Sequence, residues 1–253
     1  MLSNFTAPKF DSATTRRRGG IRRSVGACAA MLRRALPQAC VLCAASCGDT
    51  LLCSACADAM PRVGAACARC ALPSTGGATC GACLIAPPSY ASTVAAWRYA
   101  FPADRLLHAF KYGAELALAE PLAAALVDAI CARGEPLPDG IVAVPLSAAR
   151  QRQRGFNHAQ QIARTVASRL GIPLLAGLRR TRDSPPQATL ARAPRARNVH
   201  RAFACTARFD GLAIAVVDDV MTTGAALAAA ADALRGAGAG RVDAWVVTRT
   251  LLS

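Results

Sequence analysis

Between residue 89 and the end of the chain, the period of hydrophobic and polar positions changes several times. Three short runs, 140–145, 213–217 and 242–247, are apolar at nearly every position, which is typical of strands buried on both faces of a parallel sheet. Elsewhere apolar residues recur every three to four positions, which predicts four helices at 103–112, 115–132, 157–170 and 224–235. This alternation predicts an α/β domain with right-handed crossovers and helices on both faces of the sheet.

Two residues predict where two of these helices begin or end. Pro121 is expected to begin or kink the second helix, because proline has no N–H to donate inside a helix. Gly171 is expected to end the third helix.

The segment VVDDVMTTGAAL, residues 216–227, follows the middle apolar run and so lies where open α/β sheets bind ligands. Backbone N–H groups and hydroxyls of its Thr-Thr-Gly turn can hold a phosphate, assisted by the N-terminus of the next helix. The carboxylates of Asp218 and Asp219 can accept hydrogen bonds from a vicinal diol such as ribose, or help to hold Mg²⁺. An acidic strand end with a capping threonine also occurs without a ligand, but the whole combination is rarer. The Gly-Lys-Ser/Thr pattern of NTPases is missing, which disfavours that class.

Cysteine spacing indicates metal sites ahead of this domain. Eight of the 12 cysteines form four C-x2-C pairs, and the last two pairs repeat the first two 27 residues later. The paired residues are Cys40 and Cys43, Cys53 and Cys56, Cys67 and Cys70, and Cys80 and Cys83. Two such knuckles complete a tetrahedron of thiolates around Zn²⁺ with no open position, so two structural zinc sites are predicted. Redox C-x-x-C chemistry is the alternative, and how the knuckles pair stays open.

The net charge indicates which ligands are favoured, and the remaining cysteines indicate no catalytic site. The 253 residues carry a formal charge of +15, and thirteen arginines but only two acids lie between 150 and 210. Such a concentration favours phosphate or nucleic-acid ligands, because guanidinium groups pair bidentately with phosphate oxygens; a solvated arginine-rich surface is the alternative. Cys131 lies in an alanine-rich helical stretch and is predicted to be buried, and no catalytic thiol is indicated.

Three parts of the chain are expected: a basic arm at 1–36, a double zinc ribbon at 37–86 and the α/β domain at 90–253. The arm is predicted to be disordered and then briefly helical. Its apolar stretch is too short for a secretory signal, and no run of 18 strongly apolar residues exists. A cytoplasmic protein without membrane insertion is predicted.

Residues 216–227 resemble the phosphoribosyl pyrophosphate loop of the type I phosphoribosyltransferases. The resemblance implies a Rossmann-like core in which Asp218 and Asp219 contact the ribose hydroxyls. It also implies that the 5′-phosphate binds at Thr222, Thr223, Gly224, Ala225 and Ala226.

Further segments are similar to the ComF family (competence protein F): VPLSAARQRQRGFNHAQQIAR at 144–164, LLHAFKYG at 106–113, and a pattern running from Gln187 to Phe203. With the double zinc ribbon, the resemblance covers about residues 37–252. One departure is His158, where the family usually has glutamine, and this leaves the role of that position open.

The same resemblance places a pyrophosphate loop after the first apolar run. It comprises Pro145, Leu146 and Ser147 and extends to Ala149, with Arg150, Arg152 and Arg154 within reach of the phosphate oxygens. Lys111 and Arg154 are the candidate pyrophosphate contacts. The basic stretch 179–201 is predicted either to fold over a ligand or to be a solvated loop.

Two functions follow. The first is a phosphoribosyltransferase, a glycosyltransferase that binds phosphoribosyl pyrophosphate with Mg²⁺ and passes the pentosyl group to an unknown nitrogen acceptor. The second is a non-catalytic module of DNA uptake that senses a nucleotide and binds single-stranded DNA or a competence helicase. The aromatic residues able to stack on bases are few: Trp97, Tyr99, Phe101, Phe110, Tyr112, Phe156 and Trp245.

Overall fold

The structure is a computed structural model of the chain that describes residues 38–113, 116–147, 151–152, 155–181 and 202–251. The chain divides into two units at the bond between Cys53 and Ser54. The predicted arm at 1–36 lies outside the described residues. The sequence-based limits 37–86 and 90–253 stay predictions.

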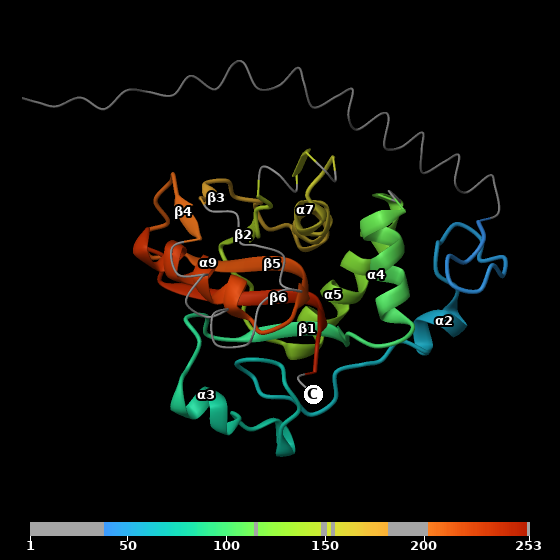
Figure 1. Cartoon of the computed structure of the whole chain (residues 1–253), viewed down its shortest axis with the longest axis horizontal. Coiled ribbons are helices and arrows are strands. Elements are labelled where there is room, and N and C mark those ends of the chain that lie inside the picture. The colour runs from blue at the N-terminus through green and yellow to red at the C-terminus, as the bar shows by residue number, and fades with distance from the viewer. Residues whose placement is uncertain (1–37, 114–115, 148–150, 153–154, 182–201, 252–253) are drawn as a thin grey trace, which may run out of the picture. The chain divides into compact units, whose positions relative to one another are not determined.

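A four-stranded parallel sheet forms the centre of the second unit (Figure 1). Its order is β1 (Thr93–Arg98), β6 (Arg241–Arg249), β5 (Ala213–Met221) and β2 (Gly140–Ala143). All three neighbouring pairs are parallel, which confirms the predicted sheet. The apolar pattern did not indicate β1, because TVAAWR is short and rich in alanine, a residue depleted in strands.

Helices cover both faces of this sheet. On one side α5 (Ala119–Arg133) and α7 (His158–Leu170) pack against each other and against the strands, while α9 (Ala225–Gly236) packs against β5 and β6. With α4 (Ala103–Tyr112), all four predicted helices are confirmed to within a few residues. Pro121 lies in the first turn of α5, where no N–H has an intrahelical partner. Gly171 ends α7 with a left-handed φ of 68°.

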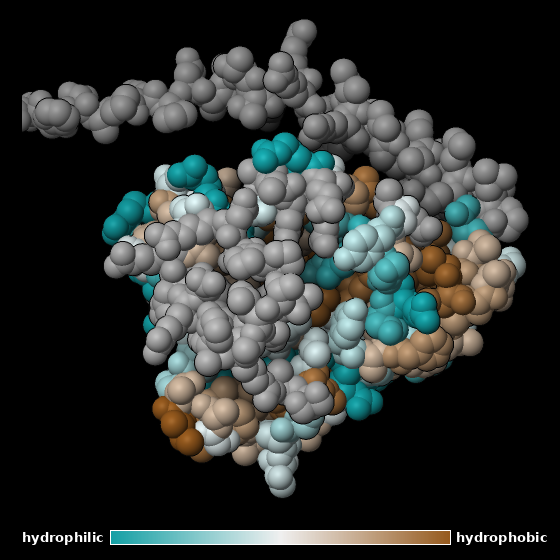
Figure 2. Space-filling view, in the orientation of Figure 1, coloured by the Kyte–Doolittle hydropathy of each residue, from teal (hydrophilic) through white to brown (hydrophobic). Residues whose placement is uncertain are grey.

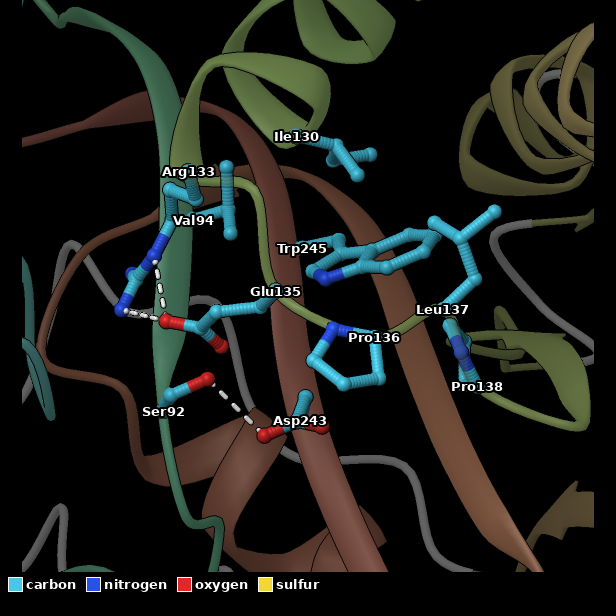
Figure 3. A pocket seen from close by; sticks show the side chains of 10 residues that line it. All are labelled: Ser92, Val94, Ile130, Arg133, Glu135, Pro136, Leu137, Pro138, Asp243 and Trp245. Atoms are coloured by element: carbon cyan, nitrogen blue, oxygen red, sulfur yellow. Dashed lines mark hydrogen bonds and ion pairs between the residues drawn. The ribbon is translucent and has the colours of Figure 1, made fainter.

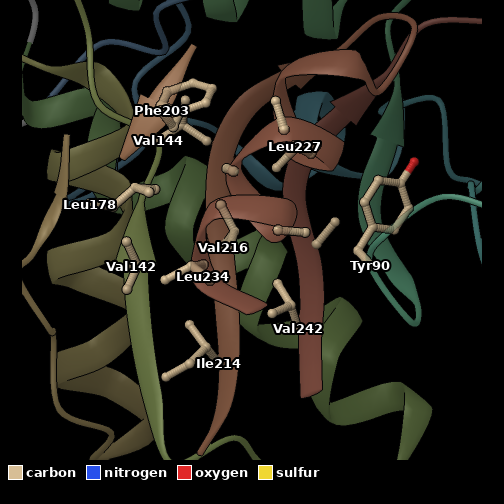
Figure 4. Close-up of a cluster of buried hydrophobic side chains, with 14 of the residues drawn as sticks. Tyr90, Val142, Val144, Leu178, Phe203, Ile214, Val216, Leu227, Leu234 and Val242 are labelled. Carbon is tan, nitrogen blue, oxygen red and sulfur yellow. The ribbon is translucent and has the colours of Figure 1, made fainter. Parts of the chain in front are cut away.

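Side chains alternate between the two faces of the strands, which explains the continuous apolar runs. Figure 4 shows Val142, Ile214, Val216 and Val242 in one cluster with Leu234 of α9. The intervening Ile141, Ala215 and Val217 are buried as well, and successive strand residues point to opposite faces. Both faces are therefore packed, and the polar residues of β5 and β6 lie on either side of these central apolar runs.

The remaining elements are short. Antiparallel strands β3 (Leu178–Arg180) and β4 (Phe203–Cys205) pair with each other beside α9. Helices α2 (Ser54–Asp58) and α3 (Gly81–Ile85) lie 27 residues apart, as their cysteines do. Single 3-10 turns occupy Thr75–Gly77 and Leu116–Leu118.

Two sequence expectations need correction. Arg179 and Arg180 belong to β3 rather than to a loop, and residues 182–201 lie outside the described residues. Cys131 is exposed, not buried. The buried face of α5 carries Leu122, Leu126 and Ile130, and the next residue is rotated by about 100° from it.

None of the helices among the described residues is long and apolar enough to cross a membrane. The described surface does carry hydrophobic side chains. Figure 2 shows such side chains over α3, where Leu84 and Ile85 are exposed.

Candidate functional site

The acid pair and the turn after it lie at the carboxyl edge of the parallel sheet. Strand β5 continues to Met221 by pairing with β6 through Met221 and Arg249. Asp218 and Asp219 therefore lie inside the strand, rather than after it as the apolar run indicated. The Thr222–Gly224 turn then leads directly into α9, which begins at Ala225.

Lys111 joins the acid pair from another element. Its Nζ lies 3.0 Å from Oδ2 of Asp219, and the side chains are only 20% and 13% exposed. Lys111 is in the last turn of α4, so that helix delivers a positive charge to the carboxyl end of β5. The structure thus brings together three of the four residues predicted to act in chemistry; the fourth, Arg154, lies outside the described residues.

The two carboxyl groups have unequal surroundings. Burial raises the pKa of Asp218 to about 7, the neighbouring Asp219 charge adds to this effect, and Lys111 opposes it. The Asp219 N–H donates to Oδ1 of Asp218 at 2.9 Å. At neutral pH Asp218 can therefore exist in both protonation states, while Asp219 is paired with Lys111.

The turn has a backbone suited to an anion. Gly224 has a left-handed φ of 80°, and an added Cβ would lie 2.7 Å from Cε of Met221 and Oη of Tyr90. The Ala225 N–H donates to Oγ1 of Thr223 at 3.3 Å. Backbone N–H groups at the start of a 12-residue helix attract negative charge. Ala225 and Ala226 are the first two residues of this helix and have small side chains.

The segment after β2 lies beside the acid pair, because the Val144 N–H donates to the Val217 carbonyl at 2.9 Å. This segment has no regular secondary structure at Pro145, Leu146 and Ser147, and Ser147 is buried. Arg152 is exposed. Ala149 and Arg150, the other predicted members of this segment, lie outside the described residues.

Asn157 fixes the start of α7 next to this segment. Its Nδ2 donates to the Val144 carbonyl at 3.0 Å, and its Oδ1 accepts from the Gln160 N–H at 3.3 Å. The following His158 is buried between Phe110 and Phe156, with ring centroids 4.9 and 4.4 Å away. The histidine that departs from the ComF pattern is thus part of an aromatic cluster.

The eight repeated cysteines form two tetrads. Within each, the sulfur atoms all lie within 4.8 Å of one another; the tetrads are Cys40, Cys43, Cys53, Cys56 and Cys67, Cys70, Cys80, Cys83. The Cys43–Cys53 and Cys70–Cys80 sulfurs are 3.8 and 3.6 Å apart. Zn–S bonds of about 2.3 Å in a tetrahedron require about 3.8 Å between sulfurs. The donor sets fit structural zinc, and each knuckle pairs with its neighbour rather than interleaving.

Backbone N–H groups lower the pKa of one cysteine thiol in each tetrad. Burial opposes ionisation of the Cys67 thiol, but N–H groups, including that of Cys80 at 3.3 Å, lower its pKa to about 6. Cys40 behaves in the same way, with its pKa lowered to about 6. Such N–H···S bonds orient metal ligands. Cys47 belongs to neither tetrad, and its thiol donates to the Thr50 carbonyl at 3.0 Å.

Two residues that the sequence did not single out contact the turn. Arg249, at the end of β6, donates to the carbonyls of Met221 and Thr222. Tyr90 packs against Gly224, and burial raises its pKa above the usual range. An arginine at the end of an apolar strand is usually solvated, so the sequence did not indicate that Arg249 is buried against the turn.

A small cavity of about 20 Å³ lies at the opposite edge of the sheet (Figure 3). It is lined by residues near the starts of β1 and β6, by Arg133 at the end of α5 and by Glu135 after that helix. A cavity of this volume holds about one water molecule, and its acids are paired with arginine or Ser92. It is therefore no alternative site for a sugar phosphate.

Solved structures with some likeness include two proteins. The glutamine phosphoribosylpyrophosphate (PRPP) amidotransferase from B. subtilis is 20% identical, with a TM-score of 0.35 over 51% of this chain and 26% of that chain. A protein from Thermus thermophilus is 19% identical, with a TM-score of 0.32 over 53% of this chain and 84% of that chain.

Sequence relatives cover more of the chain. The family described as the double zinc ribbon domain matches residues 31–84. DNA utilization protein YhgH from Salmonella typhi is 34% identical over 206 residues, which are 79% of this chain and 91% of that protein. Competence protein F from Haemophilus influenzae is 31% identical over 175 residues, which are 66% and 76% of the two chains. The chain therefore belongs to the family of DNA utilization protein YhgH and competence protein F.

Proposed function

We propose that this protein binds phosphoribosyl pyrophosphate with Mg²⁺ at the carboxyl edge of its sheet. The observation that carries the proposal is the continuous path from the acid pair of β5, through the left-handed Gly224, to the N-terminus of α9. In this proposal Asp218 and Asp219 accept hydrogen bonds from the ribose hydroxyls. The N–H groups of residues 222–226 hold the 5′-phosphate.

The reaction that fits this binding mode is pentosyl transfer. The bond between C1 of the ribose and the pyrophosphate breaks, the pyrophosphate leaves with the electron pair, and a nitrogen nucleophile forms the new bond to C1. Positive charge develops on the ribose and negative charge on the leaving group, so catalysis consists of positioning and charge stabilisation. Bound Mg²⁺ supplies positive charge to the pyrophosphate.

Lys111 is the described residue best placed to assist the leaving group. It already lies at the acid pair, 3.0 Å from Asp219, and on ligand binding its ammonium group can turn toward the pyrophosphate. Arg150 and Arg154 are proposed as further contacts, and Pro145, Leu146 and Ser147 as the backbone that receives the pyrophosphate. The acceptor is a nitrogen compound of unassigned identity.

Titration calorimetry tests the binding proposal directly. Replacing Asp218→Asn and Asp219→Asn together keeps the shape of both side chains and removes their charges. We expect binding of phosphoribosyl pyrophosphate with Mg²⁺ to weaken at least about 100-fold, because two hydrogen bonds to charged acceptors are lost. Asp232→Asn, on the exposed face of α9, is the control and should bind as wild type does. Equal affinity in wild type and the double variant would refute ribose binding by this pair.

Pyrophosphate release distinguishes an enzyme from a binding protein. The protein is incubated with the ligand, Mg²⁺ and each of a set of nucleobases and amines. Release above the background of the Asp218/Asp219 variant in any mixture supports pentosyl transfer. Release equal to that background in all of them supports the sensing module.

The second candidate function is a nucleotide-sensing, DNA-binding module. Two relatives bear names that refer to DNA utilization and competence. Tyr99, Phe101 and Tyr112 are exposed near α4, whereas Trp97, Phe110 and Trp245 are buried. Exposed aromatic rings can stack on single-stranded bases, and the charge of +15 favours the strand's phosphates. A helicase partner and a cytoplasmic location accompany this proposal.

A further inference from the structure

Arg249 connects the second cysteine tetrad to the turn at Thr222–Gly224, here called the phosphate turn. Its side chain is only 2% exposed, although it carries a full charge. Nε donates to the carbonyl of Cys70, a member of the second tetrad, at 2.8 Å. Nη1 donates to the carbonyls of Met221 at 3.0 Å and Thr250 at 2.9 Å, and also to that of Thr222.

A buried guanidinium must have its N–H groups satisfied. An unpaired buried charge is strongly destabilising, and hydrogen bonds to charged groups are stronger than those between neutral groups. Here the carbonyls come from three separate segments of the chain. They are the segment of the second tetrad, the end of β5 with the phosphate turn, and the residue after β6. Displacing any one segment therefore disturbs the hydrogen bonds that Arg249 makes to the others.

The knuckle that carries Cys70 is held by a hydrogen bond of its own backbone and by the first residue of β1. The Ala71 N–H donates to the Cys67 carbonyl at 2.8 Å, and Ala71 has a left-handed φ of 55°. Thr93 holds the same knuckle through its N–H to Ala68 and its hydroxyl to Arg69. A ribbon of this size has too little apolar core to keep its shape without metal. The position of the Cys70 carbonyl thus depends on the second tetrad together with the Thr93 hydrogen bonds.

We propose that Arg249 is a positioning residue that couples zinc binding in the second tetrad to the conformation of the phosphate turn. The proposal rests on the proposed sugar-phosphate site for its functional meaning. Loss of zinc releases the Cys70 carbonyl, and Arg249 then holds Met221 and Thr222 less firmly. The N–H groups of residues 222–226 must be ordered again before they can bind a phosphate, which weakens affinity. By linkage, the ligand tightens zinc binding by the same factor.

The tandem repeat supplies a matched control. Cys80→Ser with Cys83→Ser removes two ligands of the second tetrad and leaves Cys70 in place. Cys53→Ser with Cys56→Ser makes the same change 27 residues earlier. Both variants lose one zinc, but only the first is expected to alter the turn.

Hydrogen exchange measured by mass spectrometry on the full chain tests the coupling without any ligand. In the Cys80/Cys83 variant, we expect peptides covering 218–226 to exchange at least about tenfold faster than in wild type, since the turn opens more often. Peptides from α5 are the reference for a folded domain. In the Cys53/Cys56 variant the 218–226 peptides should exchange at the wild-type rate. Unchanged exchange in the first variant, or equal acceleration in both, overturns the proposal.

Ligand affinity gives the second measurement, in a double-mutant cycle with Arg249→Lys. Lysine keeps the charge but lacks the fork that reaches three segments. Loss of the second zinc should weaken phosphoribosyl pyrophosphate binding about tenfold with Arg249 present and less than about twofold with lysine, because the two changes interrupt one connection. An equal effect in both backgrounds overturns the coupling. If wild type binds no phosphoribosyl pyrophosphate, the proposed function fails, and hydrogen exchange still decides whether Arg249 couples zinc to the turn.

Discussion

Asp218 and Asp219 are adjacent in sequence but differ in what their carboxyl groups contact. Asp219 pairs with Lys111 at 3.0 Å, whereas burial raises the pKa of Asp218 to about 7. The folded protein without ligand therefore retains the Asp218 proton at a pH where the unfolded chain has lost it. Ionisation of Asp218 consequently lowers folding stability as the pH rises from about 4 through about 7.

This raised pKa predicts that ligand binding depends on pH. A ligand that brings Mg²⁺ and two hydroxyl donors needs Asp218 ionised, so affinity should increase as the pH rises. Between about pH 6 and pH 8 the ionised fraction of a group with a pKa near 7 grows roughly tenfold. Calorimetry with phosphoribosyl pyrophosphate and Mg²⁺ over this interval should show an increase of that size.

Asp218→Asn is the control for the pH prediction. The amide keeps the shape but has no proton to lose, so the remaining affinity should vary little with pH beyond the titration of the ligand's own phosphates. A wild-type profile no steeper than that of the variant would show that Asp218 does not control binding.

The turn between β5 and α9 shows how one element depends on backbone geometry. Gly224→Ala places a Cβ on a left-handed backbone, 2.7 Å from two buried side chains. We expect the free energy of unfolding to fall by about 1–3 kcal/mol, and phosphate binding to weaken because the turn shifts. Urea unfolding followed by circular dichroism measures the first effect, and calorimetry the second.

Gly236→Ala, in the last position of the same helix, is the matched control. A Cβ there meets nothing within 4 Å, and φ is not left-handed. Its stability should be equal to wild type or higher by up to about 1 kcal/mol. Equal losses in both glycine variants would contradict the role assigned to the turn.

The two ribbons are elements of a second kind, built around metal instead of a hydrophobic core. Elemental analysis should find two zinc ions per chain, and serine in place of two cysteines of either tetrad should leave one. More zinc than two per wild-type chain would indicate a site outside the tetrads, and less than two in fully reduced protein would contradict the tetrahedral assignment.

At the scale of the whole molecule, the charge of +15 predicts a strong salt dependence of nucleic-acid binding. Neutralising about five phosphates of a single strand would give log K against log salt a slope of about −3.5. Fluorescence anisotropy with a labelled single-stranded oligonucleotide at increasing salt measures this slope. A flat response would show that the arginines do not form a binding surface.

Tyr112→Ala separates stacking from charge in the same assay. Removing one exposed ring should cost about 1–3 kcal/mol at every salt concentration, while the slope stays unchanged because no charge is lost. Affinity equal to wild type would exclude Tyr112 as a stacking residue.

The sequence by itself determined three of the four parallel strands, the four helices, the eight metal ligands and the acid pair with its turn. These features repeat or alternate over a few residues, and local sterics, burial and ligand spacing fix them. Strand β1 was not predicted, because its alanines do not distinguish a strand from a helix. Cys131 was wrongly predicted to be buried, because a step of one residue along a helix moves a side chain to another face.

Only the tertiary structure decided which distant groups meet. The Lys111–Asp219 pair joins α4 to β5, and Arg249 lies 179 residues from the Cys70 carbonyl that it holds. No local period encodes such contacts, since they arise only when separate elements are packed at one edge of the sheet. The same packing gives a buried arginine its partners and raises the pKa of a strand-end acid, neither of which can be read from neighbouring residues.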